Sequence, residues 1–202
     1  MRPFPPELLI DEYEGIDYFV PSPELDLWVR KSFLDDQSEL FNQDHLHLNK
    51  AHIGYLWTNV PNTKQMMRVA ATAEIPFFRG NAWQKHRQMM QMEEWFGGTP
   101  DFVITFDAGL AHTASALEVG ARTDHELDHC AQALDKFGSP KFDAETGQPK
   151  FTLKGHDVEE HVGVIARYGV GGGAGKTREL VEAANRAPVI GLAEIEGICG
   201  TC

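Results

Sequence analysis

The chain has 202 residues, of which 42% are hydrophobic and 24% charged, a composition typical of a globular protein with a sizeable core. Its 30 acidic residues outnumber the 18 basic ones, so the formal net charge is -12. This charge argues against direct nucleic-acid binding, which depends on neutralising phosphate groups.

The sequence also argues against a membrane or secreted protein. No stretch approaches the roughly 18 consecutive apolar residues that a transmembrane helix needs. The first residues lack the basic-then-apolar profile of a signal peptide. Three cysteines, an odd number, do not indicate a disulfide framework. We therefore expect a cytoplasmic protein.

The N-terminal part of the chain predicts an arm followed by a helix. Residues 1–23 are rich in proline and acidic side chains, which predicts an extended arm that packs a few aromatic rings on the domain. The apolar positions of residues 24–41 predict a first helix, with Ser22 or Pro23 near its start.

The next segment carries two histidines at alternate positions. The alternation in residues 44–48 predicts a strand that presents His45 and His47 on one face. Two histidines so spaced could chelate a metal, but polar positions on a half-exposed strand or loop are the simpler interpretation.

The other predicted elements complete an α+β fold, with a small mixed sheet of about three strands packed on helices. In chain order they are a strand at 68–75, a helix at 81–96, a strand at 101–106, a helix from about 115, a loop or hairpin at 137–153, and helices at 157–168 and 177–186. The three methionines of the second helix, Met89, Met90 and Met92, indicate gap filling or a contact surface.

The most informative stretch is 123–129, which contains the motif His-Glu-x-x-His. With about 3.6 residues per turn, His125 and His129 lie on one helical face, where two imidazoles can share one metal ion. Glu126 projects beside that face and is the candidate general base. A capping box at Ser115 and Glu118 predicts the helix start, because the alternative box at Thr123 would occupy Glu126.

Catalytic zinc needs three protein ligands and one open position, so a third ligand must come from elsewhere. The extended motif with a glycine and a third histidine is absent, since Gln132 and Asp135 occupy those positions. We prefer His156, because a helix that opens there would put it one turn from Glu160. Glu159 or Glu160 is the alternative ligand.

The predicted chemistry is peptide-bond hydrolysis, with one zinc ion that activates a water molecule and Glu126 as the base. Tyr168 or His112 could donate a hydrogen bond to the developing oxyanion. Asp157 and His161 could hydrogen-bond to the metal ligands and orient them without contacting the metal. For Asp124, which precedes a ligand, simple solvation is the preferred interpretation.

The order helix–strand–strand–helix–strand, then His-Glu-x-x-His, a loop and His-x-x-x-Glu, resembles the SprT-like zincins. It is similar in particular to the metallopeptidase family encoded in bacteriophage genomes. The resemblance covers roughly residues 24–169. It divides the chain into an arm at 1–23, a zincin-like domain at 24–169, and a tail region at 170–202.

The resemblance implies a zincin domain with His125, His129 and His156 on zinc, Glu126 as the base, and a protein or peptide substrate. It also implies that one strand is a sheet edge along which an extended peptide lies; its residues are Phe102, Val103, Ile104, Thr105 and Phe106. One departure is His161, where SprT-like domains carry an aromatic residue.

Two further patterns carry less weight. The glycine-rich stretch 169–177 resembles a phosphate-binding loop, but its first glycine is replaced by Val170 and it follows a helix-like stretch, so we expect no nucleotide binding. Cys199 and Cys202 are spaced like half of a zinc site or a redox pair, but no second pair accompanies them.

The sequence is compatible with three functions. The preferred one is a zinc-dependent metallopeptidase. The second is a non-catalytic binding or assembly protein in which zinc serves stability. The third is a nucleotide-dependent factor that uses the glycine-rich loop.

Overall fold

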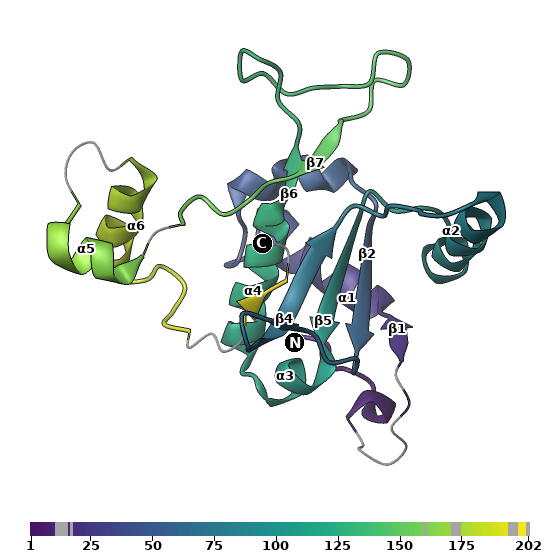
Figure 1. Ribbon diagram of the computed structural model, residues 1–202, viewed down its shortest axis with the longest axis horizontal. Coiled ribbons are helices and arrows are strands. Elements are labelled where there is room, and N and C mark those ends of the chain that lie inside the picture. The colour runs from purple at the N-terminus through teal and green to yellow at the C-terminus, as the bar shows by residue number, and fades with distance from the viewer. Residues whose placement is uncertain (11–15, 17, 160, 171–174, 194–197, 201–202) are drawn as a thin grey trace. The chain divides into compact units, whose positions relative to one another are not determined.

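A computed structural model describes residues 1–10, 16, 18–159, 161–170, 175–193 and 198–200, and Figure 1 shows its course. The chain forms two compact units. The first contains Met1–Lys154 and Ala193–Thr201, and the second contains Gly155–Leu192 and Cys202. These units divide after Lys154, whereas the sequence pattern divides the chain near residue 169. Among the described residues, no helix combines the length and apolar character needed to cross a bilayer.

A six-stranded sheet forms the centre of the first unit. Its strands are β1 (Phe19–Pro21), β2 (Ile53–Thr58), β3 (Thr63–Lys64), β4 (Met67–Glu74), β5 (Phe102–Asp107) and β8 (Ile198–Cys199). The order is β1-β2-β5-β4-β3, and β8 also pairs with β4. The sheet is mixed, as predicted, because β5 runs parallel to β2 and antiparallel to β4. The expected three strands are too few, because β1, β3 and β8 are too short to show periodicity.

Strand β5 lies inside the sheet, between β2 and β4. The implied substrate edge at Phe102–Phe106 is therefore wrong, because both edges of this strand already pair with neighbouring strands. Its near-continuous burial is typical of such a central position, and its run of apolar residues is consistent with the strand predicted at 101–106.

The helices of the first unit come from both halves of the chain. They are η1 (Glu7–Leu9), α1 (Pro23–Val29), η2 (Arg30–Leu34), η3 (Gln43–Lys50), α2 (Ala82–Phe96), α3 (Ala108–Thr113) and α4 (Ala116–His129). A small antiparallel ladder of β6 (Cys130–Gln132) and β7 (Phe151–Leu153) follows α4 directly. It encloses the predicted loop or hairpin.

The core lies on one face of the sheet. Alternate residues of β5, namely Phe102, Ile104 and Phe106, are fully buried and share a cluster with Leu127 of α4 and Leu25 of α1. The register aligns each of these aromatic or branched residues with an inward-facing residue of β2. The motif helix is thus anchored on the sheet through its apolar side.

Two sequence-based expectations about local structure are wrong. The first helix ends at Leu34 instead of continuing to 41, because the Asp35 side chain accepts a hydrogen bond from the Gln37 N–H and forms a turn. The segment with His45 and His47 is the 3₁₀ helix η3, not a strand. The Asn42 side chain caps it by accepting from the Asp44 N–H. The arm also contributes a paired strand, β1.

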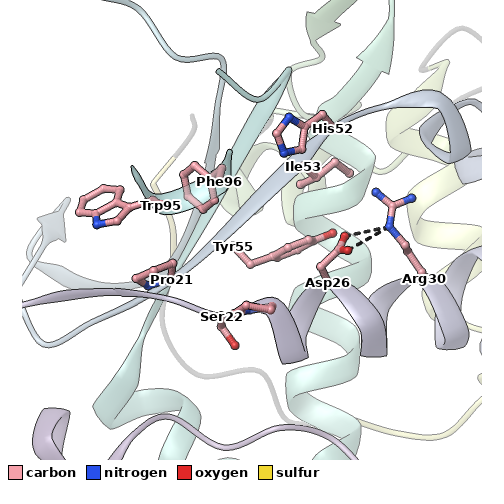
Figure 2. A pocket seen from close by; sticks show the side chains of 10 residues that line it. Pro21, Ser22, Asp26, Arg30, His52, Ile53, Tyr55, Trp95 and Phe96 are labelled. Atoms are coloured by element: carbon pink, nitrogen blue, oxygen red, sulfur yellow. Dashed lines mark hydrogen bonds and ion pairs between the residues drawn. The ribbon is translucent and has the colours of Figure 1, made fainter. Parts of the chain in front are cut away.

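Helix α2 was predicted correctly, with an Asn81 capping box at its start and Gly97 in a left-handed conformation at its end. It buries none of its residues, and Trp83 is largely exposed. A pocket of about 200 Å³ is lined by its last residues, Trp95 and Phe96, and by Tyr55 of β2. Figure 2 shows these side chains. Burial raises the pKa of Tyr55 well above its ordinary value.

The second unit contains two short helices, α5 (Val162–Tyr168) and α6 (Lys176–Ala184). The predicted helix start at 157 is wrong, because residues 155–159 are not helical and His161 is the N-cap of α5. His156 therefore does not open a helix, and Glu160 lies outside the described residues. Residues 171–174 of the glycine-rich stretch lie outside the described part of the chain.

Candidate metal centre

Helix α4 carries the motif and begins where the sequence predicts. The Ser115 hydroxyl accepts from the Glu118 N–H, and the Glu118 carboxylate accepts from the Ser115 N–H, so the capping box is complete. Leu127 is fully buried in the core. This anchoring fixes the rotation of the helix and therefore the direction in which both motif histidines point.

The two histidines converge. Their Nε2 atoms lie 3.2 Å apart, although His129 is only 2% exposed and His125 is partly buried. His129 Nδ1 lies 2.6 Å from the carbonyl oxygen of Lys154, so it donates its proton there. This bond fixes the neutral tautomer in which Nε2 presents a lone pair, the form that binds a metal.

Glu126 is buried beside this pair, with 2% of its surface exposed. Burial raises the pKa of Glu126 to about 8, and the nearby Cys199 adds to this shift. The hydrogen bond to Cys199 raises the pKa of His129 to about 8 and also raises that of His125. Several perturbed groups in one place are typical of a functional site.

Cys199 of β8 completes this cluster. Its sulfur lies 3.3 Å from His129 Nε2 and 4.0 Å from Glu126 Oε2. The ligand atoms of Cys199, His125 and His129 all lie within 4.8 Å of one another. No local sequence pattern links Cys199 to the motif, because 70 positions separate it from His129 and only strand pairing brings it here.

These three side chains fit a tetrahedral zinc ion. Zn–N bonds of about 2.0–2.1 Å place two ligating nitrogens about 3.4 Å apart, and a Zn–S bond of about 2.3 Å places sulfur about 3.6 Å from nitrogen. The corresponding separations here, 3.2 Å and 3.3 Å, are close to those values. Imidazole and thiolate are also the donor types that zinc prefers in proteins.

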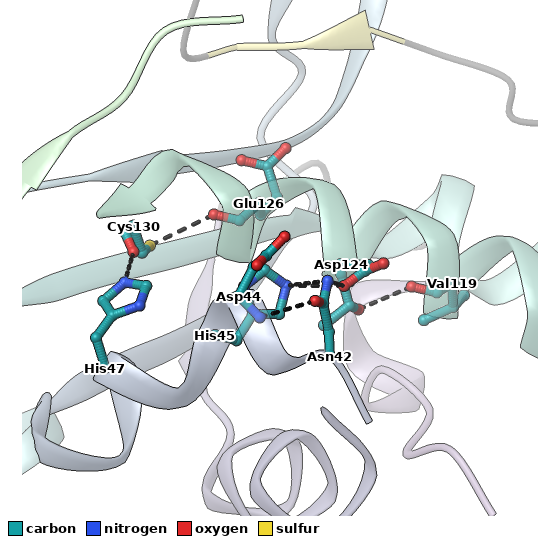
Figure 3. Close-up of polar contacts among 9 residues, drawn as sticks. Asn42, Asp44, His45, His47, Val119, Asp124, Glu126 and Cys130 are labelled. Carbon is teal, nitrogen blue, oxygen red and sulfur yellow. Dashed lines mark hydrogen bonds and ion pairs between the residues drawn. The ribbon is translucent and has the colours of Figure 1, made fainter. Parts of the chain in front are cut away.

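Helix η3 packs on the side of α4 that faces away from the Glu126 carboxylate, as Figure 3 shows. The buried His45 donates through Nε2 to Asp124 Oδ1 at 2.8 Å, and Asn42 donates to the same oxygen at 3.1 Å. His47 Nε2 donates to the carbonyl oxygen of Cys130 at 2.6 Å. Both η3 histidines therefore brace the motif helix, and the interpretation of Asp124 as simply solvated is wrong.

His112 is exposed on α3 in the first unit. The other remaining site residues of the prediction lie in the second unit or outside the described residues. His156 follows Lys154 by two positions, and Glu159 belongs to the same irregular segment. Glu160 lies outside the described part of the chain. Tyr168 ends α5 and is 74% exposed. Their roles, like those of Asp157 and His161, stay predictions.

The class of protein follows from the fold and the cluster: the chain is an α+β protein, consistent with a zincin-like fold, with a His-rich group able to hold a metal ion. The family model described as "Putative phage metallopeptidase" matches residues 26–185, and the chain belongs to this family. The predicted resemblance to phage metallopeptidases is thereby confirmed. Comparisons with curated proteins and with solved structures gave no match.

Proposed function

We propose that this protein is a zinc-dependent peptidase that hydrolyses peptide bonds in a protein or peptide substrate. The observation that carries the proposal is the convergence of His125 and His129 through Nε2 atoms 3.2 Å apart, beside the buried carboxylate of Glu126. Membership in a metallopeptidase family supports the same reaction class.

The chain's own residues have three tasks in this reaction. Zinc, when bound, supplies a Lewis acid that polarises the scissile carbonyl and lowers the pKa of water to about 7. His125 and His129 hold the ion, and the Lys154 carbonyl keeps His129 in its ligating tautomer. Glu126 accepts the proton of the attacking water and delivers it to the leaving amine nitrogen. Its buried position keeps competing solvent away from this proton.

Zinc content tests the site directly. We expect purified protein to hold about one zinc ion per chain. We expect His129→Ala to lower zinc affinity by more than about 100-fold, because loss of a residue that only hydrogen-bonds to a ligand already costs about 10- to 100-fold. The matched control is His86→Ala, which removes an exposed histidine of α2. Competition with a chromogenic chelator gives the affinities. A fully zinc-loaded His129→Ala protein would contradict the proposed site.

Hydrolysis of a mixture of unstructured peptides tests the reaction. We expect cleavage to stop when a chelator removes the metal and to return when zinc is added back. Cleavage that is insensitive to metal removal would exclude the proposal, whatever the zinc content.

We further propose His156 as the third histidine ligand. Lys154 contacts His129 through its carbonyl oxygen, and His156 is only two residues farther along the chain, within about 7 Å of extended backbone. We expect His156→Ala to lower zinc affinity at least about 10-fold. Glu159→Gln and Glu160→Gln test the alternatives, and zinc loss in either of them, with His156→Ala unaffected, would reassign the ligand.

A second candidate function is a protein in which zinc serves only to stabilise the fold. The observation that favours it is the Cys199 sulfur, 3.3 Å from His129 Nε2, because a fourth protein ligand closes the coordination sphere of zinc. The experiments below separate this candidate from the peptidase.

A further inference from the structure

The segment that carries Cys199 pairs with the outer edge of β4. Ala71 pairs with Phe106 of β5 on one side and with Cys199 of β8 on the other. The Gly200 N–H also donates to the Ala71 carbonyl at 2.9 Å. Residues 198–200 therefore occupy the edge of the sheet that borders the motif helix, and they do so as an extended peptide would.

The same pairing puts the cysteine sulfur where a catalytic site needs open space. Hydrolysis requires a coordination position for water and the scissile carbonyl, next to the general base. The Cys199 sulfur lies in this region, 4.0 Å from Glu126 Oε2 and 3.3 Å from His129 Nε2. A thiolate is a stronger zinc ligand than water, so it would exclude both reactants.

We infer that residues 198–200 are an inhibitory segment of this chain, in which Cys199 binds the catalytic metal and β8 covers the peptide-binding edge of β4. This inference rests on the proposed peptidase function. The segment is tethered, so its local concentration at the site is of millimolar order, and a substrate must compete with it.

The attachment is also weak enough to be reversible. Strand β8 contains two residues and pairs with β4 at only Val69 and Ala71, with a register shift between them. Short edge segments with few hydrogen bonds open at a small fraction of the global unfolding free energy. Release of this segment would free one coordination position and one strand edge together.

Gly200 offers a way to displace the segment without touching the thiol. A Cβ atom at this position would lie 2.9 Å from Val69 Cγ1 and 3.1 Å from Thr72 Cβ. Both neighbours belong to β4, a strand fixed in the sheet. We expect Gly200→Val to push residues 198–200 off the edge, while the metal site itself keeps its histidines.

Cobalt substitution tests the thiolate bond without relying on activity. In the full-length Co²⁺-loaded protein, a sulfur ligand gives a thiolate-to-cobalt charge-transfer absorption in the near ultraviolet. We expect this absorption in the wild type, its loss in Cys199→Ser, and its weakening in Gly200→Val, with the metal retained in all three. The matched control is Cys202→Ser, which we expect to keep the absorption.

Peptide hydrolysis by the zinc-loaded variants tests inhibition. We expect Cys199→Ser and Gly200→Val to cleave peptides at least about 10-fold faster than the wild type, equivalent to about 1.4 kcal/mol of relieved competition. Absence of the charge-transfer band in the wild type would overturn the inference, even if hydrolysis is observed. Loss of the metal in Cys199→Ser would also overturn it and would favour a structural fourth ligand.

One outcome would refute the proposed function together with the inhibitory segment. If the band is present and Cys199→Ser keeps its metal but hydrolyses nothing, Cys199 is a ligand of a site that is not a peptidase. That result refutes both inhibition and peptidase activity, whereas absence of the band combined with metal-dependent hydrolysis refutes only the inhibitory segment.

Discussion

Glu126→Gln is expected to lower peptide hydrolysis by about 10²- to 10⁴-fold while the metal content stays unchanged. Glutamine has nearly the same shape as glutamate but cannot accept a proton from water and return it to the leaving amine. The ligand atoms belong to His125 and His129, so the exchange leaves metal binding intact. Burying a neutral amide also costs less free energy than burying a carboxylate, so we expect the variant to fold.

The measurement is kcat/KM on a fluorogenic peptide mixture, made in both the wild-type and the Cys199→Ser backgrounds so that inhibition does not hide the effect. The matched control is Glu118→Gln on the same helix. Glutamine can replace glutamate in a capping box, and Glu118 is not buried in the site, so hydrolysis should stay within about twofold. Equal hydrolysis by Glu126→Gln and the parent would rule out Glu126 as the base.

Phe102→Ala is expected to cost about 3–5 kcal/mol of unfolding free energy, a large part of the roughly 5–15 kcal/mol that holds a typical domain. Phe102 is fully buried on the central strand β5, and its ring packs edge-on against Phe151 at a centroid distance of 5.3 Å. Truncation removes this contact and leaves a cavity that the surrounding strands cannot fill.

The loss of packing at Phe102 would also disturb the metal centre, because Phe151 of β7 would lose its contact. Phe151 belongs to this strand, which pairs with β6 and leads to the Lys154 carbonyl that orients His129. Urea unfolding followed by far-ultraviolet circular dichroism gives the free energy. Phe137→Ala is the control, because Phe137 is 80% exposed and its loss should change stability by less than about 0.5 kcal/mol. A loss below about 1.5 kcal/mol at Phe102 would contradict its place in the core.

Features that depend on neighbouring residues were predicted well. The capping box at Ser115 predicted the start of the motif helix, and α2 begins after Asn81, where the sequence predicts a helix. The spacing of His125 and His129 placed both imidazoles on one face, as the 3.2 Å between their Nε2 atoms confirms. Capping hydrogen bonds and helical side-chain contacts join residues three or four positions apart. The sequence pattern alone can therefore predict where a helix begins and which side chains share its face.

Features that depend on distant pairing were missed. The alternation around His45 indicates a strand, but the Asn42 cap and the hydrogen bonds of His45 and His47 to α4 and Cys130 favour the 3₁₀ helix η3. The mostly apolar run at 102–106 predicts a strand but not its neighbours, and this strand, β5, lies in the middle of the sheet. Both flanking strands, β2 and β4, precede β5 in the chain, and helix α2 separates it from them.

The sequence by itself determined the chemistry of the motif helix: two imidazoles and a carboxylate fixed by helical periodicity and by an apolar stripe that must face the core. Only the tertiary structure decided what else reaches that helix. Asp124 is held by His45 because η3 folds onto α4, and Cys199 reaches His129 because a two-residue strand pairs with β4. Such contacts gain their free energy from surfaces that exist only after folding, so no local pattern of residues records them.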